Sequence, residues 1–278
     1  MIDDPVPLVA RIPAGEFIMG ADDSEEDERP SHRVYLNEYH LGIHAVTNEE
    51  YAPFVRETGH PAPALRALPM IVPFDQQDLF RELAAPFVWP DSAPPPGRAR
   101  HPVTLVTIED AMAYCLWLQS QSGKPFRLPT EAEWEKAARG GLERLRYPWG
   151  DEIDPSHANY LADSSRKEQH STQEVGQYPA NGYQLFDMAG NVWEWVSDWY
   201  APDYYARAQY VNPPGPEGGQ MRIVRGGSWV NHNVDFLRCS YRHTIPVDSY
   251  SYSVGFRVAY SLDKTEGGMR SSQTDASL

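Results

Sequence analysis

Basic charge, cysteine and long apolar runs are all scarce in this chain. Its 24 lysines and arginines stand against 39 aspartates and glutamates, which gives a net charge of −15. Such a charge repels nucleic acid phosphates and anionic lipids, so neither nucleic acid nor a membrane is expected as a partner. No stretch approaches the roughly 20 apolar residues of a membrane span, and the first residues lack the basic start of a signal peptide. A cytoplasmic location is therefore expected.

Only two cysteines are present, Cys115 and Cys239. Two are too few for the disulfide framework of a small secreted protein, although they leave a single bridge open. Proline and glycine, by contrast, are plentiful, with 25 and 20 residues. Because both interrupt helices and strands, much of the chain is expected to be irregular.

Local signals nevertheless predict three helices and several short strands. Thr47, Thr107 and Thr130 each precede an acidic residue by three positions, which is the pattern of a capping box at a helix start. The first two helices are expected to end at Gly59 and Gly123, since glycine favours the left-handed helix cap. Short β runs are expected at residues 33–36, 222–224 and 255–260. This mixture predicts an α+β fold with low regular secondary structure.

Two parts of the chain carry no such signals. Residues 61–100 contain PAPALRALP and WPDSAPPPGRAR, which restrict the backbone to extended and turn conformations. This stretch is interpreted as a surface loop or insertion. After residue 262 the sequence lacks apolar periodicity, so the tail 263–278 is expected to be disordered.

The segment GYQLFDMAGNVWEWVSDWY at 182–200 concentrates tryptophans, glycines and a buried-looking glutamate that no ordinary helix or strand pattern requires. With IPAGEFIMG at 12–20, RLPTEAEWEKAARGG at 127–141, RIVRGGSW at 222–229 and VGFRVA at 254–259, it resembles the formylglycine-generating enzyme (sulfatase-modifying factor) family. The resemblance implies a formylglycine-generating-enzyme-like single domain, related to C-type lectins, over residues 11–262. Residues 1–10 would then be an N-terminal extension.

The turn at 187–194 has the make-up of a calcium site. Asp187 and Glu194 supply carboxylates, and the carbonyl groups of Gly190 and Val192 lie between them; these are the hard oxygen ligands that Ca²⁺ prefers. The resemblance implies a calcium ion at these four positions. The alternative is that Glu194 caps backbone amides in a buried turn.

A second calcium position follows from the resemblance alone. It would use Asn159, the carbonyl oxygen of Tyr160 and the carboxylate of Asp163. Both ions would be structural, because they would hold loops that lack strand or helix partners.

Enzymes of the family oxidise a target cysteine to formylglycine with copper bound between two cysteines. The resemblance places these cysteines at Asn231 and near Phe236, and neither an amide nor a phenyl ring replaces a thiolate as a Cu(I) ligand. Copper and formylglycine formation are therefore not expected, and no motif specifies iron. Cys115 and Cys239 match structural cysteines of the family and are expected to be free, buried thiols.

A ligand site is expected around the segment that follows RGGSW. The resemblance assigns Ser228, Trp193 and Arg242 to the substrate cleft, and the Tyr- and Ser-rich residues 248–253 are typical of a binding loop. For Trp193, as for its neighbours Trp195 and Trp199, core packing is the alternative. The expected ligand-binding set is Trp193, Ser228, Trp229, Asn231, His232, Arg242, Tyr250, Tyr252 and Ser253.

Two functions compete. One is a binding module that recognises a protein, a peptide or a small molecule through residues 230–253. A variable protein diversified by a retroelement is one kind of binding module. The absence of Lys, Glu, Gln, Met and Trp from residues 230–253 favours this kind. The alternative is a cysteine-independent, metal-dependent oxidoreductase that modifies a peptide or small metabolite, and binding is the function we favour. The catalytic candidates of the alternative are Ser228, His232, Asp235 and Arg242.

Overall fold

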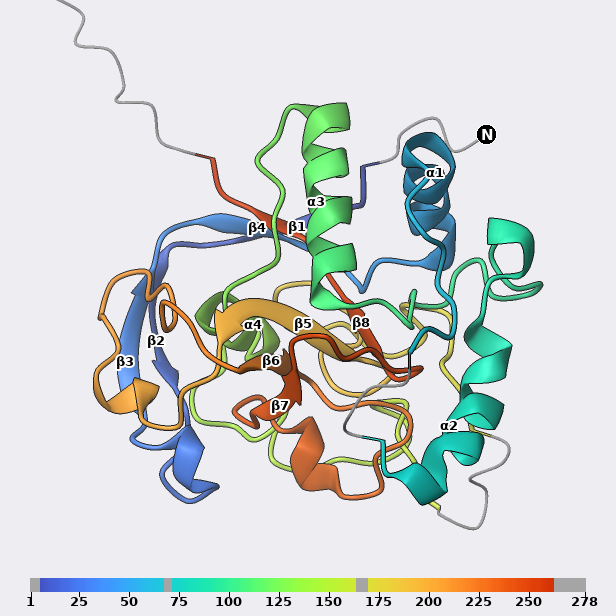
Figure 1. Cartoon of the computed structure of the whole chain (residues 1–278). Helices are drawn as coiled ribbons and strands as arrows, with labels where there is room; N and C mark the ends of the chain where they lie inside the picture. The colour runs from blue at the N-terminus through green and yellow to red at the C-terminus, as the bar shows by residue number, and fades with distance from the viewer. Residues whose placement is uncertain (1–5, 68–71, 164–169, 263–278) are drawn as a thin grey trace, which may run out of the picture.

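Three small sheets carry the β-structure of the described part of the chain (Figure 1). The computed structural model describes residues 6–67, 72–163 and 170–262. The strand order is β1-β4-β9 in one sheet, β2-β3 in another and β7-β6-β5-β8 in the third. The strands are β1 (Val9–Ile12), β2 (Gly15–Met19), β3 (His32–Leu36), β4 (Tyr39–Gly42), β5 (Trp193–Trp199), β6 (Met221–Arg225), β7 (His243–Pro246), β8 (Val254–Phe256) and β9 (Ala259–Tyr260).

The three helices predicted from capping boxes are all confirmed. Thr47, Thr107 and Thr130 each accept a hydrogen bond from the third helical amide, and the acidic side chain at that position binds back to the cap. Gly59 and Gly123 end their helices with φ of 70° and 68°, in the left-handed region. The α-helices of the described ranges are α1 (Asn48–Thr58), α2 (Gln77–Ala84), α3 (Ile108–Ser122) and α4 (Glu131–Ala138).

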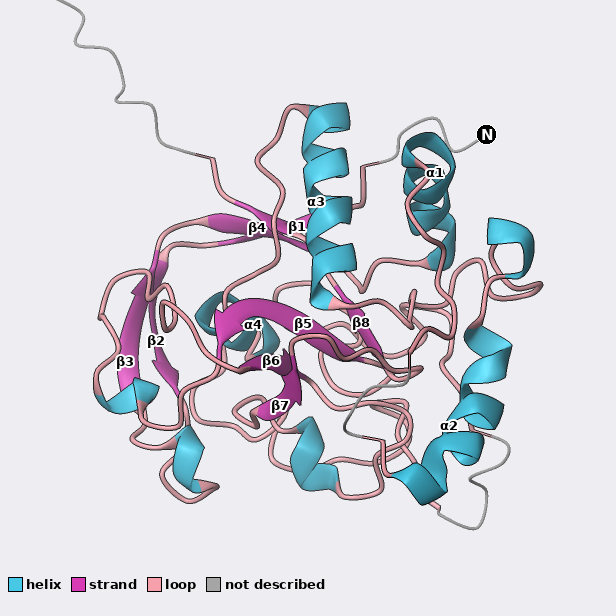
Figure 2. Cartoon of the chain, in the orientation of Figure 1, coloured by secondary structure: helices cyan, strands magenta, loops and turns pink. Residues whose placement is uncertain are grey.

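Helices and strands therefore alternate irregularly with loops, which confirms the α+β class (Figure 2). The β runs at 33–36 and 222–224 are confirmed as β3 and β6, but the run at 255–260 divides between two sheets. β8 pairs in parallel with β5, whereas β9 pairs antiparallel with β4. The predicted domain boundary at residue 11 falls inside β1, and the predicted tail lies outside the described residues.

The tryptophan-rich segment forms β5, although its sequence shows no ordinary strand pattern. β5 lies between β6 and β8, so both of its edges are paired, and its two faces pack against different hydrophobic clusters. Trp193 and Trp195 face the hydrophobic cluster that contains α1 and α3, whereas Val196 faces the cluster that contains α4. Because both faces are buried, apolar and polar residues cannot alternate in the usual way.

Residues 61–100 are more than a surface loop, which corrects the interpretation of this stretch. They contain α2 and short 3₁₀ turns, and Phe80, Ala84 and Phe87 are buried against Trp229 and Tyr250. The first residue of α2 follows Gln76, which makes no side-chain capping bond, so no local signal marks its start. The 3₁₀ turns of the described ranges are η1 (Glu26–Glu28), η2 (Phe74–Gln76), η3 (Ala85–Phe87), η4 (Pro90–Ser92), η6 (Tyr204–Ala206) and η7 (Val234–Leu237).

None of the helices in the described ranges is both long and apolar enough to span a membrane. Among the described helices α3 is the longest, with 15 residues, and its Tyr114 ring contacts that of Phe256 in β8, with centroids 5.5 Å apart. In Figure 1, α1 and α3 stand side by side above this sheet, while α4 lies behind it.

Candidate functional site

A tight turn follows β6 and carries the first group of predicted site residues. Gly226 and Gly227 adopt φ of 95° and 74°, and an added Cβ on Gly227 would come within 2.9 Å of Leu237. Only glycine fits such a position. The turn directs Ser228 inward, where its amide and hydroxyl both donate to Oδ1 of Asn231, at 2.7 and 2.9 Å. Ser228 is fully buried and its hydroxyl is already bonded, so it lacks the exposure that a nucleophile needs.

A small cavity, here called the Trp229 pocket, opens beside this turn. Its volume is about 110 Å³. The indole of Trp229 and the phenol of Tyr252 form its aromatic walls, with their ring centroids 5.8 Å apart. Phe87 stacks on both rings, at 6.0 and 6.2 Å, and so fixes their orientation. The lining residues are Leu83, Leu161, His170, Trp229, Val230 and Tyr252.

Tyr250 and Ser253 support this pocket from behind. The Tyr250 ring is buried, and its hydroxyl bonds the backbone N–H and C=O of Arg66 at 2.8 and 3.1 Å. The Ser253 hydroxyl lies 3.0 Å from that of Ser251, and its carbonyl accepts from the amide of Trp193. Both residues therefore fasten chain segments to each other, which is a structural role within the predicted ligand-binding set.

Trp193 and Arg242 lie away from the Trp229 pocket. Trp193 is only 4% exposed and stacks on His243 at 4.9 Å, as the core-packing alternative expects. Arg242 is also buried, and its guanidinium binds both carboxylate oxygens of Glu131 at 2.8 and 3.0 Å. A guanidinium held in this way has no free edge for a substrate, so Arg242 acts as part of the core.

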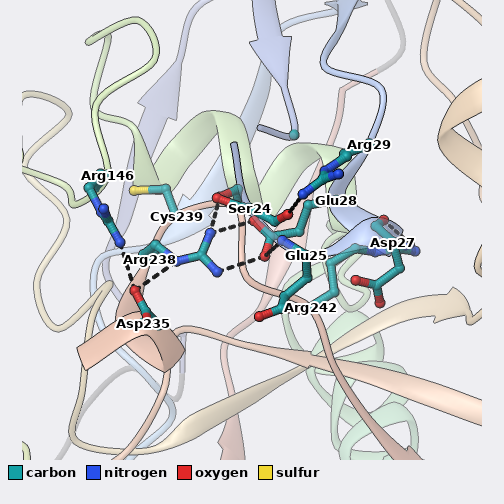
Figure 3. A network of polar contacts seen from close by, with 12 residues as sticks. Ser24, Glu25, Asp27, Glu28, Arg29, Arg146, Asp235, Arg238, Cys239 and Arg242 are labelled. Atoms are coloured by element: carbon teal, nitrogen blue, oxygen red, sulfur yellow. Dashed lines mark hydrogen bonds and ion pairs between the residues drawn. The ribbon is translucent and has the colours of Figure 1, made fainter. Parts of the chain in front are cut away.

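The four catalytic candidates do not converge on one point. Asp235 lies between the guanidinium groups of Arg146 and Arg238, at 2.6 and 3.5 Å, on the surface side of a polar network (Figure 3). His232 is exposed next to the turn, whereas Ser228 and Arg242 are buried with partners of their own. Acid–base catalysis needs the reacting groups within hydrogen-bond reach of one substrate, and this arrangement does not provide that.

The polar network of Figure 3 continues into the protein interior. Arg238 binds both carboxylate oxygens of Glu28, at 2.6 and 2.8 Å, and both side chains are buried. Cys239 follows in the chain and lies beside this network. The pair ties the loop after β2 to the turn that follows η7.

Glu194, predicted as a calcium ligand, makes a buried ion pair instead of capping backbone amides. Its two oxygens accept from Nε and a terminal nitrogen of Arg257, at 2.6 and 2.7 Å, and from the indole N–H of Trp134 at 2.7 Å. Sequence reasoning missed Arg257 and Trp134, which are 63 and 60 residues away in the chain. A calcium ion that used Glu194 would therefore have to share this carboxylate with Arg257.

Asp187 is a better donor for a cation. The carboxyl is buried and accepts a hydrogen bond from the amide of Gly176 at 2.8 Å. Burial raises the pKa of Asp187 to about 6, because the desolvated carboxylate is disfavoured. A cation would stabilise this carboxylate. However, no group of three His, Cys, Asp or Glu side chains suited to a metal occurs within residues 6–67, 72–163 and 170–262, so any ion here depends on backbone oxygens as well.

The second predicted calcium position is a junction between loops. The Asn159 amide donates to the carbonyl of Ser171 and to Oδ1 of Asn191, at 2.9 and 3.3 Å. The carbonyl of Tyr160 accepts from Ala162, and Asp163 is exposed. These contacts hold the loop against the 187–191 turn, and calcium at this position stays a prediction.

Sequence reasoning also missed the outer wall of the Trp229 pocket. Phe80, Leu83 and Ala84 follow the i, i+3, i+4 spacing of a helical apolar face, which was a usable signal for α2. Leu161 comes from a different loop, and its amide donates to the carbonyl of Asn231 at 2.9 Å. Only tertiary structure brings these segments together.

Comparison with known proteins gives consistent matches over nearly the whole chain. Residues 3–262 match the family described as sulfatase-modifying factor enzyme 1-like domain. The formylglycine-generating enzyme of Streptomyces coelicolor is 39% identical over 293 residues, which cover 92% of this chain and 90% of that protein. A protein of Mus musculus named inactive C-alpha-formylglycine-generating enzyme 2 is 32% identical over 294 residues. These cover 93% of this chain and 87% of that protein.

Solved structures show the same relationship. The structure of PvdO from Pseudomonas aeruginosa has a TM-score of 0.74 and 26% sequence identity to this chain. The match covers 93% of this chain and 95% of PvdO, so the likeness extends over nearly the whole fold.

Proposed function

This chain belongs to the family of sulfatase-modifying factor enzyme 1-like domains, and we propose that within this family it is a recognition domain that does not form formylglycine. Its fold is the α+β, C-type-lectin-related fold of the formylglycine-generating enzymes. The ligand would be a protein, a peptide or a small molecule, bound at the Trp229 pocket and the exposed residues of the 230–253 region. One of its relatives carries the word inactive in its name, so loss of activity has a precedent in the family.

The state of the two cysteines carries the proposal. Cys115 is 2% exposed in the cluster around α1 and α3, and Cys239 is 1% exposed in the cluster around α4. Both thiols are free, and burial raises the pKa of each to about 12. A cysteine binds copper as the thiolate and not as the protonated thiol. Two protonated thiols in separate clusters cannot act together as the copper-binding pair that the family uses.

The surface around the Trp229 pocket supports recognition. His232 and Asn233 are exposed and follow Val230, which lines the pocket. Polar side chains beside an apolar centre are the usual arrangement of a binding surface. The competing oxidoreductase function would need the four catalytic candidates together, and their separate partners argue against it.

The first test combines copper binding with peptide oxidation. We expect the chain, incubated with Cu(I) and a cysteine-containing peptide, to bind no stoichiometric copper and to form no aldehyde detectable by hydrazide labelling and mass spectrometry. The Streptomyces coelicolor enzyme serves as the positive control. The double variant Asn231→Cys, Phe236→Cys should gain about one Cu(I) per chain, because two soft thiolates select this ion. Aldehyde formation by the unmodified chain would refute the proposal.

We also propose a structural calcium ion at the turn of Asp187, with carbonyl oxygens of Gly190 and Val192 as further donors. With calcium at about 100 times its Kd, stabilisation would be about 2.7 kcal/mol, which corresponds to a rise in Tm of roughly 5 °C. Thermal unfolding with added calcium and with a chelator checks this expectation. Asp187→Asn should abolish the difference, whereas Asp163→Asn tests the second position separately. Equal Tm values with calcium and chelator would eliminate both ions.

A further inference from the structure

The Trp229 pocket is too small to enclose a metabolite. Sites for drug-sized ligands typically occupy about 300–1,000 Å³, whereas this pocket has about 110 Å³. A cavity of about 150 Å³ lined by apolar side chains accommodates one benzene molecule. The pocket is therefore of the right size for a single branched side chain that belongs to a larger ligand.

Its lining selects against charge. Trp229, Tyr252, Leu83, Leu161 and Val230 present apolar surface, and the imidazole of His170 is the polar side chain among the described residues that line it. Neither a carboxylate nor a guanidinium is among them. Apart from this imidazole and the Tyr252 hydroxyl, a charged group would find little among the described lining residues to replace its hydration, which makes its burial costly. The lining therefore favours an uncharged, apolar occupant.

The walls are also held in place before any ligand arrives. Phe80 packs against Tyr252 at 5.3 Å, and Phe87 stacks on Trp229 and Tyr252. The guanidinium of Arg98 covers the Phe87 ring at 4.5 Å. Rings fixed by several neighbours lose little conformational entropy on binding, so even a small contact contributes to affinity.

We propose that the Trp229 pocket takes one aliphatic side chain of about leucine size from a peptide segment of a partner protein. The inference rests on the proposed function and names the ligand of the same site. Side-chain volume and the absence of charge are the two features of the anchor that the site recognises.

The first experiment titrates the whole chain with N-acetyl amides of leucine, alanine and aspartate, and follows the indole N–H resonance of Trp229 by NMR. Trp229→Phe identifies that resonance. Leucine adds three carbons to alanine, so we expect the leucine amide to bind up to roughly 50-fold more tightly when all three are buried. The aspartate amide should not shift the resonance. Equal binding of leucine and alanine amides would overturn the inference.

A filled pocket provides the matched test. Leu83→Trp places a large ring in the cavity, whereas Leu79→Trp adds the same ring at an exposed position of the same helix. We expect Leu83→Trp to weaken binding of the leucine amide at least about 10-fold and Leu79→Trp to change it less than about twofold. Thermal unfolding checks that both variants are folded. Equal losses in the two variants would show that the ligand binds elsewhere.

Failure of this inference is distinguishable from failure of the proposed function. If aldehyde forms in the copper assay, the proposed function is wrong whatever the amides do. If no aldehyde forms and leucine is not preferred, only the anchor is wrong.

Discussion

Replacing Glu194 by glutamine is expected to lower the free energy of unfolding by about 3–5 kcal/mol. Arg257 is fully buried, and Glu194 supplies its countercharge through two hydrogen bonds. Glutamine keeps an oxygen for the indole of Trp134 but removes the negative charge. The guanidinium then loses its ion-pair partner and keeps the neutral carbonyls of Gly42 and Phe186 as acceptors, with the Asp187 carboxyl as a more distant charge. Urea unfolding, followed by tryptophan fluorescence, measures the loss.

An exposed ion pair is the matched control for this change. Asp203 and Arg207 lie 3.3 Å apart, with side-chain exposures of 69% and 56%. Solvent already screens these charges, so Asp203→Asn should cost less than about 1 kcal/mol. If the two substitutions cost the same, the Glu194–Arg257 pair does not stabilise the fold in the way its burial indicates.

Substituting Gly190 by alanine is expected to destabilise the protein by about 3 kcal/mol or more, since two costs add. The residue has φ of 81°, where an L-residue loses roughly 1–2 kcal/mol. An added Cβ would also lie 2.5 Å from the carbonyl oxygen of Asn159, which is backbone and cannot swing away. Overpacking of this kind costs a further 1–3 kcal/mol or so.

The same substitution should disturb the Trp229 pocket. The amide of Gly190 donates to Gly226 at 2.8 Å, and the carbonyl of Asn191 accepts from the amide of Trp229 at 3.0 Å. A shift of the turn that contains Gly190 would therefore also move Trp229, which forms a wall of the pocket. We expect binding of the leucine amide to weaken in folded Gly190→Ala protein, which the Trp229 resonance reports.

Gly59→Ala measures the free-energy cost of a positive φ without a steric clash. Gly59 has a comparable φ of 70°, but an added Cβ would meet nothing within 4 Å. This variant should lose only about 1 kcal/mol. A loss at Gly59 as large as the loss at Gly190 would mean that the close approach to Asn159 has no energetic effect.

The sequence predicted helix starts well because capping is local. The threonine of each capping box and its acidic partner are three residues apart, so the bond forms within one turn of chain. Helix α2 has no such cap, and it is held by contacts of Phe80 and Ala84 with distant residues. Helix α2 therefore forms because of tertiary packing. The prolines around it made the helix hard to predict from the sequence.

The predicted ligand-binding residues are divided between a pocket and the core. Trp229 and Tyr252 line the pocket, whereas Arg242 was assigned to a cleft and is bound to Glu131 in the core. An arginine has the same appearance in a sequence whether it faces a ligand or a buried carboxylate. Its partner lies 111 residues away, so no spacing rule reveals the pair.

The position of β8 and β9 also has a consequence for synthesis on the ribosome. Both strands lie between Val254 and Tyr260, yet β8 pairs with β5 and β9 pairs with β4. Neither sheet is complete until this short stretch has left the exit tunnel, so stable folding must wait for nearly all of the described chain. Contacts between such distant segments are slow to form. A nascent chain that stalls before Val254 would expose the edges of β4 and β5 and become a substrate for chaperones and proteases.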